Sequence, residues 1–454
     1  MIKTSAIFLF LNYCLGKKVD MSMVVAKIDW RQLYTFASRQ ALLGFCFDGI
    51  ERLTKEFSEE LKQNPMGRDL LMNWMGKAQQ IRRQNMKVNG VAAKLYSKFR
   101  EDGLRCCILK GQGNALMYPN AYSRNPGDID VWVNASREDI TEYAKRHFNL
   151  EDDIRFHHLE TTMDGVPVEL HFFPCSMNNP IYHARLQKWF RRNADLQCSN
   201  VVSLPDGIGE IAIPTTAFNV VYQLTHLYHH FFDEGIGMRQ IIDYYYVVCD
   251  FYKVYQNSSK ITPSLFTIKE GSTSHPDPLT LRGEGGNRPT RCSEPLRSKD
   301  GGASKPSPDC AGWDRRDAIG DIASDASVSS AFTTDSSAST ALVVVQRELK
   351  YLGLWKFAGA VMYVLHEALG LSEEKMIAPM DEKRGKLLLT EILNGGNFGQ
   401  HFTKYGGFTH QCMGKKYFLK IWRNMHFVRY YPAEALCEPL FRTWHFFWRL
   451  KHRR

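Results

Sequence analysis

The chain reads Leu109-Lys110-Gly111-Gln112-Gly113 and, shortly after, Arg124-Asn125-Pro126-Gly127-Asp128-Ile129-Asp130-Val131-Trp132-Val133. The second stretch predicts a β-strand that carries two carboxylates, because alternate residues of an extended chain share a face. Asp128 and Asp130 then project together, on the face opposite to the apolar side chains that alternate with them. Two like charges held so close are unfavourable unless one is protonated or a cation bridges them. The pair therefore predicts a cation site, which a magnesium ion would satisfy.

A third carboxylate follows in a predicted hairpin. Two expected strands, residues 154–163 and 166–172, are joined by Asp164-Gly165, which is a strong signal for a two-residue turn. Glu169 and His171 share one face of the second strand, and Glu169 lies beside the aspartates if that strand neighbours theirs. A glycine turn, an Asp-x-Asp strand and a later acid supply oxygen ligands for hard cations and a close backbone approach to phosphate. Metal-assisted phosphoryl or nucleotidyl transfer requires both.

Three motifs occur in order: L-K-G at residues 109–111, R-x-x-x-D-I-D at 124–130 and V-E-L-H at 168–171. On these residues the chain resembles the DNA polymerase beta-like nucleotidyltransferase superfamily, and more closely its uncharacterised bacterial nucleotidyltransferase branch. Residues 235–240 with Asp243, 392–399 and 431–434 also resemble that branch, so the resemblance covers most of the chain from about residue 29 to 448, apart from a central insertion. One departure is Gly111-Gln112, where the wider superfamily has Gly-Ser or Gly-Gly at the phosphate turn.

These motifs give three acids a candidate catalytic role. Asp128, Asp130 and Glu169 are expected to bind one or two Mg²⁺ ions, with Mn²⁺ also compatible, and Asp130 or Glu169 would take the proton of an acceptor hydroxyl. The structural alternative is that Asp128 caps the turn after Pro126-Gly127 and that Glu169 is a surface strand residue.

Four residues are candidate phosphate ligands. Gly111 and Gly113 would let backbone amides approach the phosphates without a side-chain clash. Lys110 or Arg124 would neutralise charge on the leaving pyrophosphate. Arg124 is favoured because a guanidinium contacts phosphate through two hydrogen bonds, whereas Lys110 could equally extend out of the strand end.

Further polar residues carry weaker signals. His171 would orient a carboxylate or contact the nucleotide, or serve a structural role. Arg239 would pair with Asp243 one helical turn away, or reach the nucleotide. The set His226, His229 and His230 has helical spacing but no H-E-x-x-H pattern, so helix packing or an acceptor pocket is favoured over metal binding.

Composition is that of an ordinary soluble protein. The chain has 454 residues, 44% hydrophobic and 23% charged, with a net charge of +10 that suits a polyanionic ligand without choosing among nucleotides, nucleic acid and anionic lipid. The 11 cysteines form no C-x-x-C pair and are expected to be reduced core residues in a cytoplasmic protein. A short apolar run near the start imitates a signal peptide but is too short to span a bilayer, and no other membrane span is expected.

The predicted fold class is α+β, with a small mixed-sheet nucleotidyltransferase domain flanked by helical regions. The expected divisions are an N-terminal extension of uncertain role (1–22), a helical region (23–99), the catalytic domain (100–205), a helical domain in two parts (206–255 and 341–454) and, between these parts, a disordered low-complexity insertion (256–340).

The leading functional hypothesis is transfer of a nucleoside monophosphate from a triphosphate to a hydroxyl of a small molecule or sugar-like precursor. Transfer to RNA or to a protein hydroxyl ranks lower, because no aromatic and basic recognition pattern is evident. A third hypothesis, supported by Gln112, is a nucleotide-binding or toxin-antitoxin-like protein without turnover. The nucleobase, the acceptor and the oligomeric state do not follow from the sequence.

Overall fold

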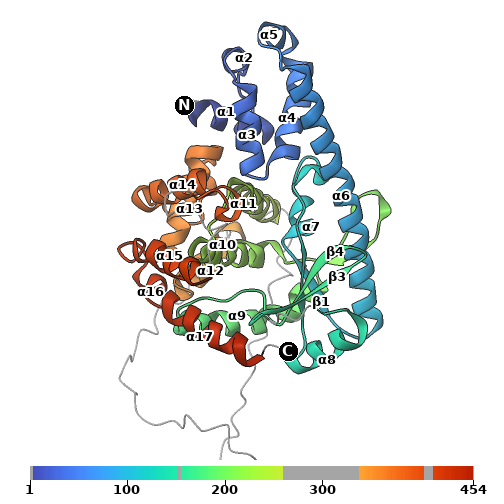
Figure 1. Ribbon diagram of the computed structural model, residues 1–454, viewed down its shortest axis with the longest axis vertical. Helices are drawn as coiled ribbons and strands as arrows, with labels where there is room; N and C mark the ends of the chain where they lie inside the picture. Colours follow the sequence, from blue (N-terminus) through green and yellow to red (C-terminus); the bar gives the residue numbers. More distant parts are fainter. Residues whose placement is uncertain (1–3, 151–154, 259–336, 403–412, 453–454) are drawn as a thin grey trace, which may run out of the picture. The chain divides into compact units, whose positions relative to one another are not determined.

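A computed structural model describes residues 4–150, 155–258, 337–402 and 413–452 (Figure 1). The N-terminal helices are α1 (Thr4–Cys14), α2 (Ser22–Val25), α3 (Trp30–Arg39), α4 (Leu43–Glu56), α5 (Ser58–Gln63) and α6 (Arg68–Glu101). The mixed segment comprises β1 (Cys106–Leu109), α7 (Gly111–Ala115), η1 (Ala121–Ser123), β2 (Ile129–Val133), α8 (Arg137–His147), β3 (His158–Met163), β4 (Val166–His171), α9 (Pro180–Ser199), β5 (Val201–Ser203), η2 (Pro205–Gly207) and β6 (Glu210–Ala212). The remaining elements are α10 (Thr216–Asp233), α11 (Met238–Ser258), α12 (Ser337–Tyr351), α13 (Trp355–Leu369), η3 (Glu373–Lys375), α14 (Glu382–Gly395), η4 (Asn397–Gly399), α15 (Met413–Met425), α16 (Pro432–Ala435) and α17 (Glu438–His452).

The main sheet has four strands in the order β1-β2-β4-β3. β1 is antiparallel to β2, β2 is parallel to β4, and β4 is antiparallel to β3. The expected hairpin is present: Asp164 and Gly165 form its turn with φ of 51° and 72°, which matches the twist of the flanking strands. The fold is therefore α+β, with a small mixed sheet between helical flanks, as the sequence predicts.

Helices bury both faces of this sheet. Ile129, Val131 and Val133 pack with residues of α6 and α8 in one hydrophobic core. Trp132 faces the other way and stacks on Phe218 of α10 with a centroid separation of 6.0 Å. In Figure 1, α6 lies to the right of the sheet and α8 lies below it, while α9 and α10 lie to its left. Trp132 and Asp130 point to the same face of β2, so the acid-bearing face is covered by helices α9 and α10.

The first helix is part of the fold. Residues 1–22 were expected to form an extension of uncertain role, but α1 buries Phe10 and Leu11 in the core that also contains α13. The Asn12 side chain donates to the Ala368 carbonyl at 3.1 Å. The apolar run near the start of the chain is therefore a packed helix, and none of the described helices has both the length and the apolar composition needed to cross a bilayer.

Several expected boundaries differ from the observed ones. The strand expected at residues 154–163 begins at His158. The expected domain end at residue 205 falls within the β5–β6 hairpin, whose strands pair with each other. α11 continues to Ser258 and α12 begins at Ser337, so helix occupies both ends of the expected 256–340 insertion, whose interior lies outside the described residues. Eight cysteines of the described residues are free and six of them are buried, as expected of reduced core residues.

Candidate active site

Five side chains that can bind a cation share one face of the sheet. Asp130 on β2 is paired in register with Glu169 on β4, which confirms that the hairpin acid lies beside the Asp-x-Asp strand. On β3, Glu160 is opposite Glu169 and His158 is opposite His171. Paired residues and residues two apart in a strand point to the same face, so three strands contribute to one polar cluster.

Asp130 is the buried centre of this cluster. One of its oxygens lies 3.0 Å from Lys110 Nζ, and the other lies 3.0 Å from His171 Nε2. Burial alone would raise the pKa of Asp130, but the Lys110 ammonium and the hydrogen bond from His171 outweigh it and hold this pKa below its ordinary value. Asp130 is therefore ionised, with two cationic neighbours balancing its charge.

His171 joins the two carboxylates. Its Nε2 also lies 3.2 Å from Glu169 Oε2. Burial disfavours the imidazolium, yet the hydrogen bonds to Asp130 and Glu169 prevail and raise the pKa of His171 to about 9. For Glu169, burial works to raise the pKa, and the hydrogen bond from His171 outweighs it so that the pKa falls. His171 thus orients both acids, which is one of the roles expected for it.

Asp128 stands apart from the buried group. It precedes β2, and its side chain is exposed. The nearby Asp130 carboxylate raises the pKa of Asp128 to about 6. Among the described residues, Asp130, Glu169 and His171 bring ligand atoms within 4.8 Å of one another, and Asp128 does not belong to that group. Of the three acids expected to bind metal, the structure therefore brings two together and leaves the third at the rim.

Lys110 points into the cluster rather than out of the strand end. It follows β1 with φ of 50°, a left-handed conformation that is costly for a residue with a side chain. Its Nζ lies 2.7 Å from His226 Nε2 on α10 in addition to the Asp130 contact. Burial opposes its charge, but Asp130, Asp128 and Glu169 raise the pKa of Lys110 above its ordinary value. Lys110 is thus a fixed cation that links the sheet acids to the helical region.

The two glycines of the turn after β1 have different neighbours. Gly111 has φ of 35° and lies beside the Asp128 carbonyl, where a Cβ would be 3.9 Å from the oxygen. A Cβ on Gly113 would be 3.0 Å from Ile213 Cγ2, so this glycine is needed for packing. The Gln112 side chain is buried and donates to Asn89 of α6. Gln112, the residue at which the chain differs from the wider superfamily, therefore packs against α6.

The two candidate arginines have different surroundings. Arg124 was favoured as a phosphate ligand, but it forms a buried two-point ion pair with Asp243, with Nε–Oδ1 and Nη2–Oδ2 distances of 2.8 Å. The expected pairing of Arg239 with Asp243 is corrected accordingly. Arg239 donates instead to the Asn125 carbonyl at 3.2 Å, and its guanidinium lies 5.5 Å from the Phe398 ring centroid. Within the described ranges no ion pair involves Arg239.

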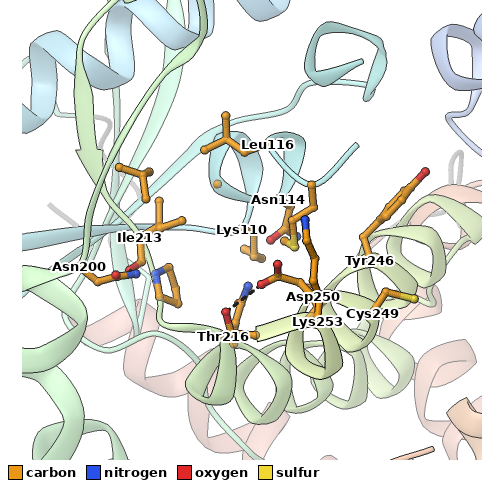
Figure 2. Close-up of a pocket in the computed structure, with 16 residues that line it drawn as sticks. Lys110, Asn114, Leu116, Asn200, Ile213, Thr216, Tyr246, Cys249, Asp250 and Lys253 are labelled. Atoms are coloured by element: carbon orange, nitrogen blue, oxygen red, sulfur yellow. Dashed lines mark hydrogen bonds between the residues drawn. The ribbon is translucent and has the colours of Figure 1, made fainter. Parts of the chain in front are cut away.

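Two neighbouring cavities share Lys110. The smaller one, of about 50 Å³, lies at the acids and is lined by Lys110, Gly111, Arg124, Gly127, Asp128, Asp130, Gln223, His226, Leu227, Arg239, Gln240, Asp243 and Phe398. The larger one, of about 480 Å³, lies between the β5–β6 segment and helices α10 and α11; Figure 2 shows Thr216, Asp250 and Lys253 facing Lys110 and Asn114 across it. Asn114 of the larger cavity and Gln223 of the smaller one exchange hydrogen bonds of 2.9 and 2.6 Å, so an amide pair forms part of the wall between them.

Sequence reasoning missed His158 and Glu160 and gave His226 only a general role. The two β3 residues carry a readable signal, because counting back from the two-residue turn pairs Met163 with Val166 and hence places Glu160 and His158 opposite Glu169 and His171. His226 contacts Lys110 and also lies 3.0 Å from His230. That contact joins segments more than one hundred residues apart, for which the local sequence pattern contains no signal.

The donors present suit a divalent cation. Asp130, Glu169 and His171 offer two carboxylate oxygens and a ring nitrogen within a 4.8 Å group, at the edge of a cavity that also contains the Asp128 carboxylate. Hard cations such as Mg²⁺ and Mn²⁺ prefer such oxygen ligands. The cluster can therefore hold a divalent ion once Lys110 or the His171 proton no longer balances the charge of Asp130.

Residues 26–255 match the model of a family described as uncharacterised nucleotidyltransferase, which is slightly more than half of the chain. The chain belongs to this uncharacterised nucleotidyltransferase family. The matched segment contains every side chain of the acid cluster and Arg239. Membership in this nucleotidyltransferase family implies a nucleoside triphosphate substrate and, in general, a divalent metal ion.

Other comparisons add little. A crystal structure of an antigenic nucleotidyltransferase-like protein from Paracoccidioides brasiliensis is similar over 38% of this chain and 90% of that chain, with 13% identity and a TM-score of 0.22. A TM-score this low supports no conclusion about fold or mechanism. No curated protein matches the chain at a significant level.

Proposed function

We propose that the protein transfers a nucleoside monophosphate from a nucleoside triphosphate to a hydroxyl of a small molecule or sugar-like precursor and releases pyrophosphate. The observation that carries this proposal is the in-register pairing of Asp130 and Glu169 beside a cavity that also contains Arg239 and Lys110. Family membership supports the triphosphate donor. We further propose Mg²⁺ as the ion, since carboxylate oxygens predominate among the ligands.

The chain's own residues supply the remaining requirements of an in-line transfer. The acceptor oxygen forms a bond to the α-phosphorus as the bond from that phosphorus to the pyrophosphate oxygen breaks, and the acceptor proton passes to Glu169 or Asp130. The divalent ion, when bound, supplies charge neutralisation of the phosphate oxygens and lowers the pKa of the acceptor hydroxyl. Arg239 binds the departing phosphates, and the Gly111 amide approaches them without a side-chain clash.

We propose the larger cavity as the acceptor site. It adjoins Lys110, is large enough for a small organic molecule, and presents hydroxyl and amide groups suited to a polyhydroxylated ligand, from Asn114, Asn200, Thr216 and Asn219. Asp250, which accepts a hydrogen bond of 2.8 Å from Thr216, provides a negative charge at its wall. The free thiols support a reducing compartment such as the cytoplasm.

To test this proposal, the protein is incubated with each of the four α-labelled triphosphates, Mg²⁺ and a cell extract. The release of pyrophosphate and the molecule that acquires the label are measured. Label in a small metabolite, with release of pyrophosphate that stops when EDTA removes the metal, supports the proposal. Label on RNA or on a protein would reassign the acceptor class. Tight triphosphate binding without pyrophosphate from any acceptor would contradict the enzymatic proposal and favour a nucleotide-binding protein.

A further inference from the structure

Three histidines gather where β3 begins and β4 ends. His157 directly precedes β3, His158 is its first residue, and His171 is the last residue of β4. Their ring centroids are 4.3 Å apart for His157 and His158, 5.5 Å for His157 and His171, and 5.1 Å for His158 and His171. Ring nitrogens of all three lie within 4.8 Å of one another, which is close enough for one ion to contact them together.

One of these rings has a buried nitrogen without any polar partner. Nδ1 of His171 is buried and neither donates to nor accepts from a described group, although the side chain is more than nine-tenths buried. Nδ1 of His158 is also buried and makes no aligned hydrogen bond, but it lies 3.2 Å from Glu169 Oε2. Leaving a buried polar atom unsatisfied costs about 1–3 kcal/mol, so the His171 nitrogen points to a ligand at this cluster.

The opposite nitrogens of the same rings contact carboxylates. His158 Nε2 lies 3.2 Å from Glu160 Oε1, and His171 Nε2 lies 3.0 Å from Asp130 Oδ1. A metal-bound histidine commonly donates its second ring N–H to a carboxylate, which fixes the tautomer and directs the other nitrogen at the ion. Both rings thus have, on one side, the carboxylate contact typical of a metal ligand. On the other side, His171 has an unpartnered nitrogen and His158 has a nitrogen beside Glu169.

We propose that His157, His158 and His171 form a site for a borderline transition metal of the Zn²⁺ class, which adjoins the carboxylate site for the hard cation and shares His171 and Glu169 with it. Imidazole nitrogen favours Zn²⁺, Co²⁺, Ni²⁺ and Cu²⁺, whereas Mg²⁺ prefers oxygen. Glu169 Oε2, which lies 3.2 Å from His158 Nδ1, can supply a fourth ligand. An ion here fixes the rings of His158 and His171, and through His171 it fixes the orientation of Asp130 and Glu169.

The test uses the full-length protein, stripped of metal and titrated with Co²⁺ in a large excess of Mg²⁺. One equivalent of Co²⁺ should bind and give the intense visible absorption of a tetrahedral nitrogen-rich site, and one equivalent of Zn²⁺ should abolish that absorption. His157→Gln and His158→Gln should each remove it. Glu160→Gln, which changes a carboxylate behind a ligand, should weaken Co²⁺ binding about 10- to 100-fold. The control His147→Gln changes an exposed histidine of α8 and should leave the titration unchanged.

Three results would overturn the proposal: no tetrahedral Co²⁺ absorption in the unchanged protein, absorption that persists in both His157→Gln and His158→Gln, or Co²⁺ that excess Mg²⁺ displaces. Circular dichroism of the metal-free variants shows whether they are folded. If they are not, the Co²⁺ titration of the unchanged protein still shows whether a tetrahedral site exists. The proposal is independent of nucleotidyl transfer: Asp130→Asn should abolish pyrophosphate release yet retain a Co²⁺ spectrum.

Discussion

The balance of charge around Asp130 governs the site at the scale of single residues. Lys110 and His171 each lie 3.0 Å from one of its oxygens, and Arg239 faces the same small cavity. A buried carboxylate is tolerable only when cations compensate it. Arg239 differs from the other two cations because it contacts no acid by an ion pair among the described residues, so its charge is available to a ligand.

Arg239→Gln should weaken triphosphate binding about 10- to 100-fold, since a charge-assisted hydrogen bond contributes about 1.5–3 kcal/mol. Stability should change little, because the guanidinium's one hydrogen bond within the described residues is the 3.2 Å contact with the Asn125 carbonyl. Calorimetric titration with a nonhydrolysable triphosphate measures the effect. Binding equal to that of the unchanged protein would exclude Arg239 from the phosphate site.

Arg124→Gln is the matched comparison. It breaks a buried ion pair with Asp243 and should lower the free energy of unfolding by about 3–5 kcal/mol, because an uncompensated charge remains in the interior. Denaturant unfolding checks this value. A variant of ordinary stability that binds triphosphate weakly would instead restore Arg124 as the phosphate ligand.

At the scale of elements, the local pattern predicts much of the sheet. Alternation of acids with Ile129 and Val131 identifies β2, and Asp164-Gly165 identifies the β3–β4 turn. The sequence does not predict that β2 pairs with β4. α8 and β3 lie between these strands in the chain, and a local pattern contains no information about which distant strand is the neighbour. The partner of Arg124 was missed for the same reason: Asp243 comes from α11, far along the chain.

Glu434 connects α16 to the start of α9, and its titration should make the stability of the fold depend on pH. It lies in α16 and accepts hydrogen bonds from the backbone N–H groups of Asn178 at 2.5 Å and Asn179 at 3.2 Å, just before α9. Burial is the main cause that raises the pKa of Glu434 to about 7, against the two hydrogen bonds that lower it. The folded protein therefore holds the Glu434 proton more tightly than the unfolded chain, whose glutamates titrate near pH 4.3.

The stabilisation from the protonated Glu434 is complete below about pH 4 and is lost as the pH rises toward 7, by roughly 3 kcal/mol. Glu434→Gln cannot titrate, so its free energy of unfolding should fall less between pH 4.5 and pH 7 than that of the unchanged protein. Urea unfolding across this range measures the two slopes. Equal slopes would show that Glu434 titrates normally in the folded state.

At the scale of the whole molecule, the first helix of the described chain packs against a helix that lies more than three hundred residues further along. α1 packs on α4 and α13, and Lys17 donates to the Gly370 carbonyl at 2.7 Å. The sequence offered no reason to join α1 to α13, since its apolar run predicts an N-terminal extension in preference to a signal peptide or an anchor. Only tertiary packing distinguishes these possibilities, because the same residues are apolar in all three.

Phe10→Ala should lower the free energy of unfolding by about 3–5 kcal/mol, because the ring is fully buried in the core shared with α13. Leu9→Ala, which removes a side chain that is 42% exposed on the same helix, should have a much smaller effect. Thermal and denaturant unfolding compare the two. Equal, small effects would mean that α1 is not part of the cooperative fold.

The central claim is that Asp130 and Glu169 serve one reaction centre for nucleotidyl transfer. The most direct test compares Mg²⁺-dependent pyrophosphate release by the unchanged protein and by Asp130→Asn, with circular dichroism to confirm that the variant is folded. The account predicts that turnover falls by about 10²- to 10⁴-fold or more, the range associated with losing a group that takes part in proton transfer. A folded Asp130→Asn variant that releases pyrophosphate at the unchanged rate would contradict the account.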